Sequence, residues 1–123
     1  MTSARRIFLI AGIYGLLVIV PPYFLEARVA RDYPPAITHP ENYYGFLGVT
    51  LAWQLAYLVI ASDPLRYRPL MLVAVFAKWS FVAAVAVLYW QGRVTGPVLG
   101  FASIDFVWGL LFLMAFRKLG RIG

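Results

Sequence analysis

Four long, continuous apolar runs constrain this sequence more than any other feature. They cover about residues 7–25, 43–61, 69–90 and 97–116. Each is close to the roughly 20 residues that a helix needs to cross a hydrocarbon core of about 30 Å. Strands are not expected, because polar and apolar residues do not alternate and because open sheet edges in lipid would leave backbone groups unpaired. We predict one all-α integral membrane domain over residues 1–123, an antiparallel bundle of four transmembrane helices.

The composition supports a lipid environment. The chain is 63% hydrophobic and 13% charged, whereas soluble domains are about half apolar and about a quarter charged. A soluble domain of 123 residues has too much surface for its volume to hide this much apolar area. We therefore expect the protein in the cell membrane.

Prolines and polar residues mark the ends of the predicted helices. Pro21 and Pro22 lie inside the first run and should kink or end that helix near its outer side. The segment 38–41 (Thr-His-Pro-Glu) is typical of a helix start, with a capping side chain, an early proline and an acid near the positive end of the helix dipole. The connection of about 26–42 is the longest, and it alone has room for structure of its own.

The distribution of basic residues predicts that both ends are cytoplasmic. One side of the membrane would hold seven bases, in the two terminal segments and the second connection: Arg5, Arg6, Arg66, Arg68, Arg117, Lys118 and Arg121. The other side would hold only Arg28, Arg31 and Arg93, and the basic side normally faces the cytoplasm. Since this basic collar accounts for the net charge of +6, we expect it to meet anionic lipid headgroups rather than nucleic acid.

Lys78 and Asp105 are the most informative residues, because each lies inside an apolar run. A charged group at the bilayer centre costs about 2.5–3.5 kcal/mol on insertion scales, so it indicates function by default. Counted along their helices, the two residues reach similar depths, although side chains that lean toward their own helix N-termini would be drawn apart. Three interpretations stay open: a salt bridge that fixes helix packing, a polar site for a ligand or transported species, or separate fates such as snorkelling of Lys78.

Further candidates lie at the same depth. Gln54 is near the middle of the second run, and Tyr57 shares its face by helical spacing. Phe101 and Trp108 share a stripe with Asp105 and would surround the carboxylate with aromatic surface. Apolar walls with a few polar groups are typical of small-molecule sites, while ordinary packing is the alternative for each residue. The candidate ligand site is therefore Gln54, Tyr57, Lys78, Phe101, Asp105 and Trp108.

The outer connection gathers a second group of polar candidates, Glu26, Asp32, His39 and Glu41. A histidine among carboxylates can do acid–base chemistry near pH 7, and helix capping or loop structure is the alternative. No metal or cofactor is expected, because the chain has no cysteine and His39 is its one histidine. Nucleotide-binding glycine loops and the HExxH and GxSxG motifs are also absent, which disfavours ATPases, zinc proteases and serine hydrolases.

Small residues recur at four-residue spacing on two of the predicted helices. Gly48, Ala52 and Ala56 form such a ridge on the second, and Ala11 with Gly15 a shorter one on the first. Ridges of this kind let helices approach closely in lipid. They predict either packing within the bundle or a contact between two copies of the chain.

The plan of four short spans resembles that of two groups, the DoxX-like membrane proteins and the emopamil-binding and sigma-2-receptor group. In the second group, acidic residues within the bundle face sterol-like ligands, and Asp105 is similar in that respect. Small multidrug exporters resemble the chain less, since their essential glutamate lies mid-span in the first helix, where Tyr14 stands here. The likeness is one of architecture and assigns no role to a residue.

We expect a small multi-pass protein that binds a lipid-like ligand or a partner subunit through this buried polar centre, without catalysis of its own. One alternative is a membrane isomerase or transferase that uses Asp105, or His39 with Glu41, to transfer protons on a lipophilic substrate. Another is a proton-coupled transporter that works as a homodimer. The identity of the ligand and the oligomeric state are not determined by the sequence.

Overall fold

Every regular element that the structure describes is helical. The computed structural model describes residues 2–32 and 37–122, with side chains up to residue 120. The elements in order are α1 (Ser3–Ile19), the 3-10 helix η1 (Pro21–Phe24), α2 (Glu26–Asp32), α3 (Pro40–Ser62), α4 (Arg68–Trp90) and α5 (Gly96–Ile122). Four candidate membrane spans satisfy both length and hydropathy, at Ser3–Phe24, Pro40–Ser62, Arg68–Trp90 and Gly96–Gly120. The prediction of an all-α chain with four helices suited to a bilayer is confirmed.

The proline pair ends the first long helix as predicted. α1 stops at Ile19, and one turn of 3-10 helix follows because Pro21 and Pro22 have no backbone N–H to continue the α-helical pattern. The Tyr43 hydroxyl then donates a hydrogen bond to the Pro22 carbonyl oxygen at 2.6 Å. This bond fastens η1 to the start of α3.

The long connection contains α2, and the start of α3 differs from the expectation in one respect. His39 occupies the N-cap position, but its side chain makes no capping hydrogen bond to the backbone of the first turn. Instead, His39 Nδ1 lies 3.2 Å from Glu41 Oε1. The predicted side-chain cap is therefore wrong, while the early proline, Pro40, and the acid in the first turn are present.

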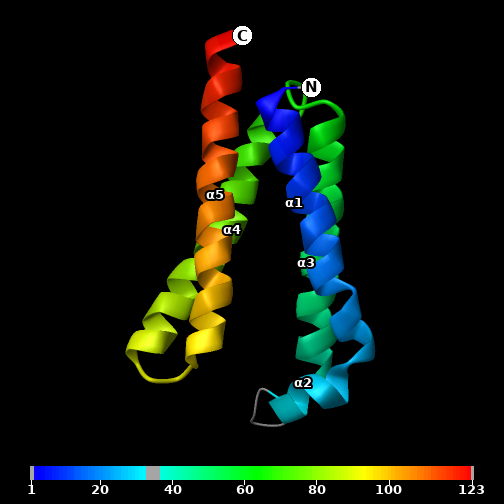
Figure 1. Ribbon diagram of the computed structural model, residues 1–123, viewed down its shortest axis with the longest axis vertical. Coiled ribbons are helices and arrows are strands. Elements are labelled where there is room, and N and C mark those ends of the chain that lie inside the picture. The colour runs from blue at the N-terminus through cyan, green and yellow to red at the C-terminus, as the bar shows by residue number, and fades with distance from the viewer. Residues whose placement is uncertain (1, 33–36, 123) are drawn as a thin grey trace.

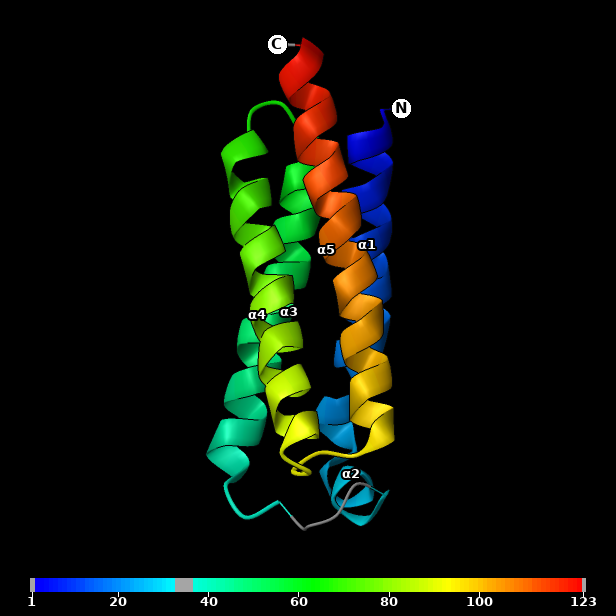
Figure 2. The ribbon, with the colours of Figure 1, turned by 90° about the vertical axis from the view of Figure 1, so that its left-hand side faces the viewer.

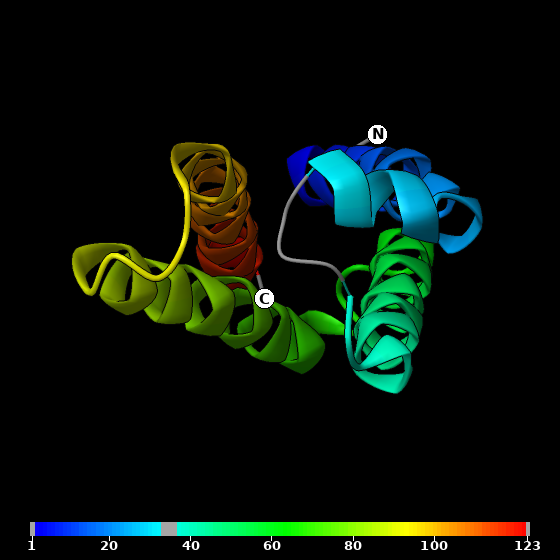
Figure 3. The same cartoon turned by 90° about the horizontal axis from the view of Figure 1, so that it is seen from below.

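The four long helices associate as two pairs. α1 packs along α3, and α4 packs along α5. The pairs meet at the end of the molecule where both termini lie and diverge toward the opposite end (Figure 1). α2 lies at that diverging end (Figure 2). Seen from there, the two pairs face each other, with α2 on the side of the α1–α3 pair (Figure 3).

Aromatic packing joins the pairs in the half of the molecule near the termini. Phe8 of α1 stacks on Phe112 of α5 with ring centroids 4.4 Å apart, and Tyr57 of α3 lies 4.9 Å from Phe112. Met71 and Ala74 of α4 are fully buried in the same cluster. Aromatic pairs contribute about 0.5–1.5 kcal/mol beyond the area they bury. The core therefore lies on one side of the molecule's midpoint and leaves the diverging half without one.

Two arginines of the basic collar bind helix carbonyls. Arg5 Nε donates to the Ala61 carbonyl oxygen at 2.9 Å, near the end of α3, and Arg68 Nε donates to that of Phe116 at 2.9 Å, in the last turns of α5. Carbonyls in the last turn of a helix have no partner within it, so Arg5 satisfies an unpaired acceptor at Ala61. Arg121 lies outside the described side chains.

Glycines of α1 allow its close approach to α3. A Cβ added at Gly12 would collide with Leu58, and one added at Gly15 would collide with the Gln54 side chain. The small residues predicted to form a ridge on α3 do not all pack against another helix, because Ala52 is exposed. The ridge that packs is on α1, where small residues meet larger side chains of α3.

Candidate functional site

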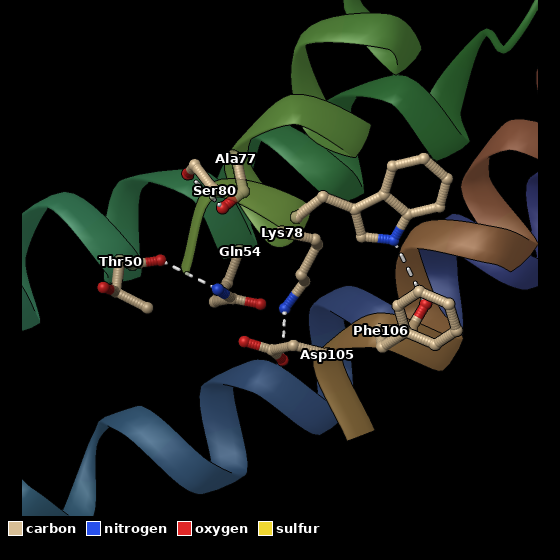
Figure 4. A network of polar contacts seen from close by, with 8 residues as sticks. Thr50, Gln54, Ala77, Lys78, Ser80, Asp105 and Phe106 are labelled. Carbon is tan, nitrogen blue, oxygen red and sulfur yellow. Dashed lines mark hydrogen bonds and ion pairs between the residues drawn. The ribbon is translucent and has the colours of Figure 1, made fainter. Parts of the chain in front are cut away.

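An ion pair lies about midway along α4 and in the first half of α5. Lys78 Nζ is 3.1 Å from Asp105 Oδ1, and the two side chains are 14% and 27% exposed (Figure 4). The opposite lean of the two side chains does not prevent the contact, because the long lysine side chain spans the offset. Of the interpretations left open by the sequence, separate fates for the two charges are thus excluded by the structure.

A cavity of about 460 Å³ adjoins this ion pair. It lies between the two helix pairs in their diverging half, and every helix contributes to its lining. The walls are largely apolar, with side chains that include Val18, Ile19, Phe46, Leu47, Phe81 and Ile104. Gln54, Lys78 and Asp105 line the end of the cavity nearer the aromatic core. We call these three residues the polar centre.

Gln54 carries the one buried side-chain oxygen or nitrogen without a hydrogen-bond partner in the described part of the chain. The residue is 2% exposed, and its Nε2 donates to the Thr50 carbonyl oxygen at 2.9 Å. Its Oε1 accepts no hydrogen bond, although Figure 4 shows this oxygen on the side of the Lys78 ammonium group. The Thr50 bond determines which end of the amide is nitrogen. The oxygen is fully buried, and a buried acceptor without a donor destabilises the fold.

The aromatic candidates separate into two groups. Tyr57 is buried, lines the cavity, and has its ring centroid 5.6 Å from Lys78 Nζ, within the range of a cation–π interaction. Phe101 also lines the cavity. Trp108 does not, and instead packs 6.0 Å from Tyr14 and 6.1 Å from Phe112. The reason is position along α5, since Trp108 is nearly one turn closer to the core, where the pairs have converged.

Several cavity residues were not singled out from the sequence. Tyr14, Trp53 and Phe81 all line it, from α1, α3 and α4 respectively. Nothing in the sequence marks them, because these helices are apolar on every face and lack the amphipathic pattern that separates inside from outside in soluble proteins.

The polar residues of the 26–42 connection do not converge on one site within the described chain. Asp32 forms exposed ion pairs with two arginines of its own helix, at 3.6 and 3.5 Å. His39 and Glu41 form a separate exposed pair, and Glu26 lies in the first turn of α2. Among the described residues, no group of three His, Cys, Asp or Glu side chains could hold a metal ion. Residues 33–36 of this connection lie outside the described part.

The polar centre can hold the polar end of a mostly apolar molecule. It pairs one positive with one negative charge, is partly reachable from the cavity, and has apolar walls beside it. Sites for small molecules combine these features. Comparisons of the chain with protein-family models, with curated proteins and with solved structures found no match.

Proposed function

We propose that this protein is a membrane-embedded binding protein for a lipophilic small molecule. Its four long helices form an antiparallel bundle, with both termini cytoplasmic and α2 at the outer surface. The ligand occupies the cavity between the two helix pairs, and its polar end meets the polar centre. The distribution of basic residues and the shared end of the two termini support this orientation.

The cavity carries the proposal. Its volume of about 460 Å³ is within the range of about 300–1,000 Å³ that small-molecule sites occupy. A space lined largely by apolar side chains favours a hydrocarbon occupant. The Lys78–Asp105 pair at one end adds charged groups that a polar atom of the ligand can bind.

The contacts and positions of the acid–base residues favour binding over proton-transfer catalysis. Asp105 Oδ1 already accepts a hydrogen bond from the Lys78 ammonium group at 3.1 Å. His39 and Glu41 are exposed on the surface and do not line the cavity. The acid–base residues of the described chain are thus either paired or remote from the space that would hold a substrate.

Variants that fill the cavity with a large side chain test the proposal. The Ile104→Trp variant places an indole in the cavity, and Val107→Trp is its matched control, because Val107 is on the same helix, is similarly exposed and does not line the cavity. Both variants and the unchanged protein are purified in nanodiscs and labelled with a photoreactive alkyl lipid analogue, and the labelled peptides are mapped by mass spectrometry.

We expect labelling of cavity-lining peptides in the unchanged protein and in Val107→Trp, and a loss of at least fivefold in Ile104→Trp. Equal labelling of all three proteins, or labelling confined to the outward faces of the helices, would contradict the proposal. Thermal unfolding of each sample shows whether the tryptophan variants remain folded.

A further inference from the structure

The charge of the polar centre restricts what its ligand can carry. Lys78 and Asp105 neutralise each other, so the site has no net charge to offer a ligand. A carboxylate, phosphate or ammonium group placed beside this pair would be an uncompensated charge in a region of low dielectric constant, which is strongly unfavourable. The polar end of a ligand that fits here is neutral.

The hydrogen-bonding capacity of the centre restricts the ligand further. A lysine ammonium group has three donors, and Lys78 gives one of them to Asp105. On the acceptor side, Asp105 Oδ2 accepts no hydrogen bond from the described residues. A group that both donates and accepts satisfies both sides at once. A hydroxyl does this, whereas an ether oxygen only accepts.

The place of the centre along the helices excludes large headgroups. Gln54 is eleven residues from Tyr43, near the start of α3, which corresponds to about 16 Å of helix. A ligand that reaches from Tyr43 to the centre carries its polar end inward, away from the membrane surface. One hydroxyl can be desolvated at modest cost, while a phosphorylated headgroup at this depth cannot.

We infer that the ligand is a neutral, membrane-soluble alcohol, bound with its hydroxyl on the Lys78–Asp105 pair and its hydrocarbon in the diverging half of the cavity. The inference rests on the proposed function and adds the chemical class and orientation of the ligand. The hydroxyl accepts from the Lys78 ammonium group and donates to the Asp105 carboxylate.

Three photoreactive probes with the same chain of about twelve carbons, chosen to match the roughly 16 Å of helix, test this inference. They end in a hydroxyl, a methyl ether and a carboxylic acid. The unchanged protein in nanodiscs should be labelled in the cavity about tenfold more efficiently by the alcohol than by the ether or the acid, since the ether cannot donate to the Asp105 carboxylate. The photoreactive group is at the far end of the chain from the polar group, so it should attach near Tyr43 or Phe46.

The double variant Lys78→Met with Asp105→Leu removes the pair without leaving a single unpaired charge. It should bind alcohol and ether equally and keep the labelling of the cavity. The matched control is Ser103→Ala, which removes an exposed hydroxyl of α5 that bonds only to its own helix, and it should keep the tenfold preference.

Labelling of the cavity by all three probes with equal efficiency would overturn the alcohol assignment and leave the proposed function intact. No cavity labelling by any probe would overturn both. A preference for the acid or the ether in the unchanged protein also refutes the inference, and this measurement does not depend on whether the double variant folds.

Discussion

Arg68 contacts Phe116 in two ways at once. Its Nε donates to the Phe116 carbonyl oxygen at 2.9 Å, and its guanidinium carbon lies 3.6 Å from the centroid of the Phe116 ring. The contact joins the first residue of α4 to the last turns of α5. A planar guanidinium group can stack on a ring while an edge N–H donates, which an ammonium group cannot reproduce.

The Arg68→Lys substitution should therefore destabilise the protein although it keeps the charge. We expect a loss of about 1–2 kcal/mol, from the hydrogen bond and the cation–π contact together. The control is Arg66→Lys, because Arg66 is exposed and its guanidinium carbon is 5.5 Å from the Tyr67 ring centroid. Unfolding in increasing fractions of SDS gives the difference, and equal stability of the two variants would show that the contact contributes nothing.

Lys78 and Asp105 should stabilise the protein only as a pair, so the loss of one should lower the free energy of unfolding more than the loss of both. Asp105→Asn or Lys78→Met leaves one charge without its partner in the membrane interior, and each should cost about 2–3 kcal/mol. The double variant Lys78→Met with Asp105→Leu should regain most of that loss, because no orphan charge remains. A double-mutant cycle of unfolding free energies measures the coupling, and additive losses would mean that the two side chains act independently.

Gly15 should resist substitution, whereas Gly45 should tolerate it. A Cβ at Gly15 collides with the Gln54 carboxamide, so Gly15→Ala must displace that side chain and weaken its bond to Thr50, at a cost of about 1–3 kcal/mol. Gly45 of α3 has open space around it, and Gly45→Ala should be neutral or stabilising by up to about 1 kcal/mol. The same denaturation assay compares the two, and a harmless Gly15→Ala would place Gln54 elsewhere.

The proposed orientation can be measured directly because the chain has no cysteine of its own. Single cysteines at Thr38 and Gln91 should react with a membrane-impermeant maleimide on intact cells. Cysteines at Ser62 and Lys118 should react only after the membrane is permeabilised. The reverse pattern would place the termini outside, and reaction at all four positions would argue against a spanning bundle.

Much of the fold could be predicted from the sequence, because the bilayer sets the length of a spanning helix and a run of apolar residues shows where one lies. The proline pair at 21–22 ended α1 as expected, since a missing backbone N–H acts locally. Lys78 and Asp105 stood out for the same kind of reason, as charges are rare in apolar runs. Features that depend on local backbone chemistry or on transfer from water to lipid can therefore be predicted from the sequence alone.

Which faces of these helices meet was decided only by the tertiary structure. Because the helices are apolar all round, the sequence could not tell that Tyr14 lines a cavity, that Trp108 packs beside the core instead, or that Arg68 lies against Phe116. In lipid, helices associate through close packing and hydrogen bonds rather than through burial of an apolar stripe. The contacts between helices, and the cavity they leave between the pairs, therefore follow from the shapes of side chains that are distant in the sequence.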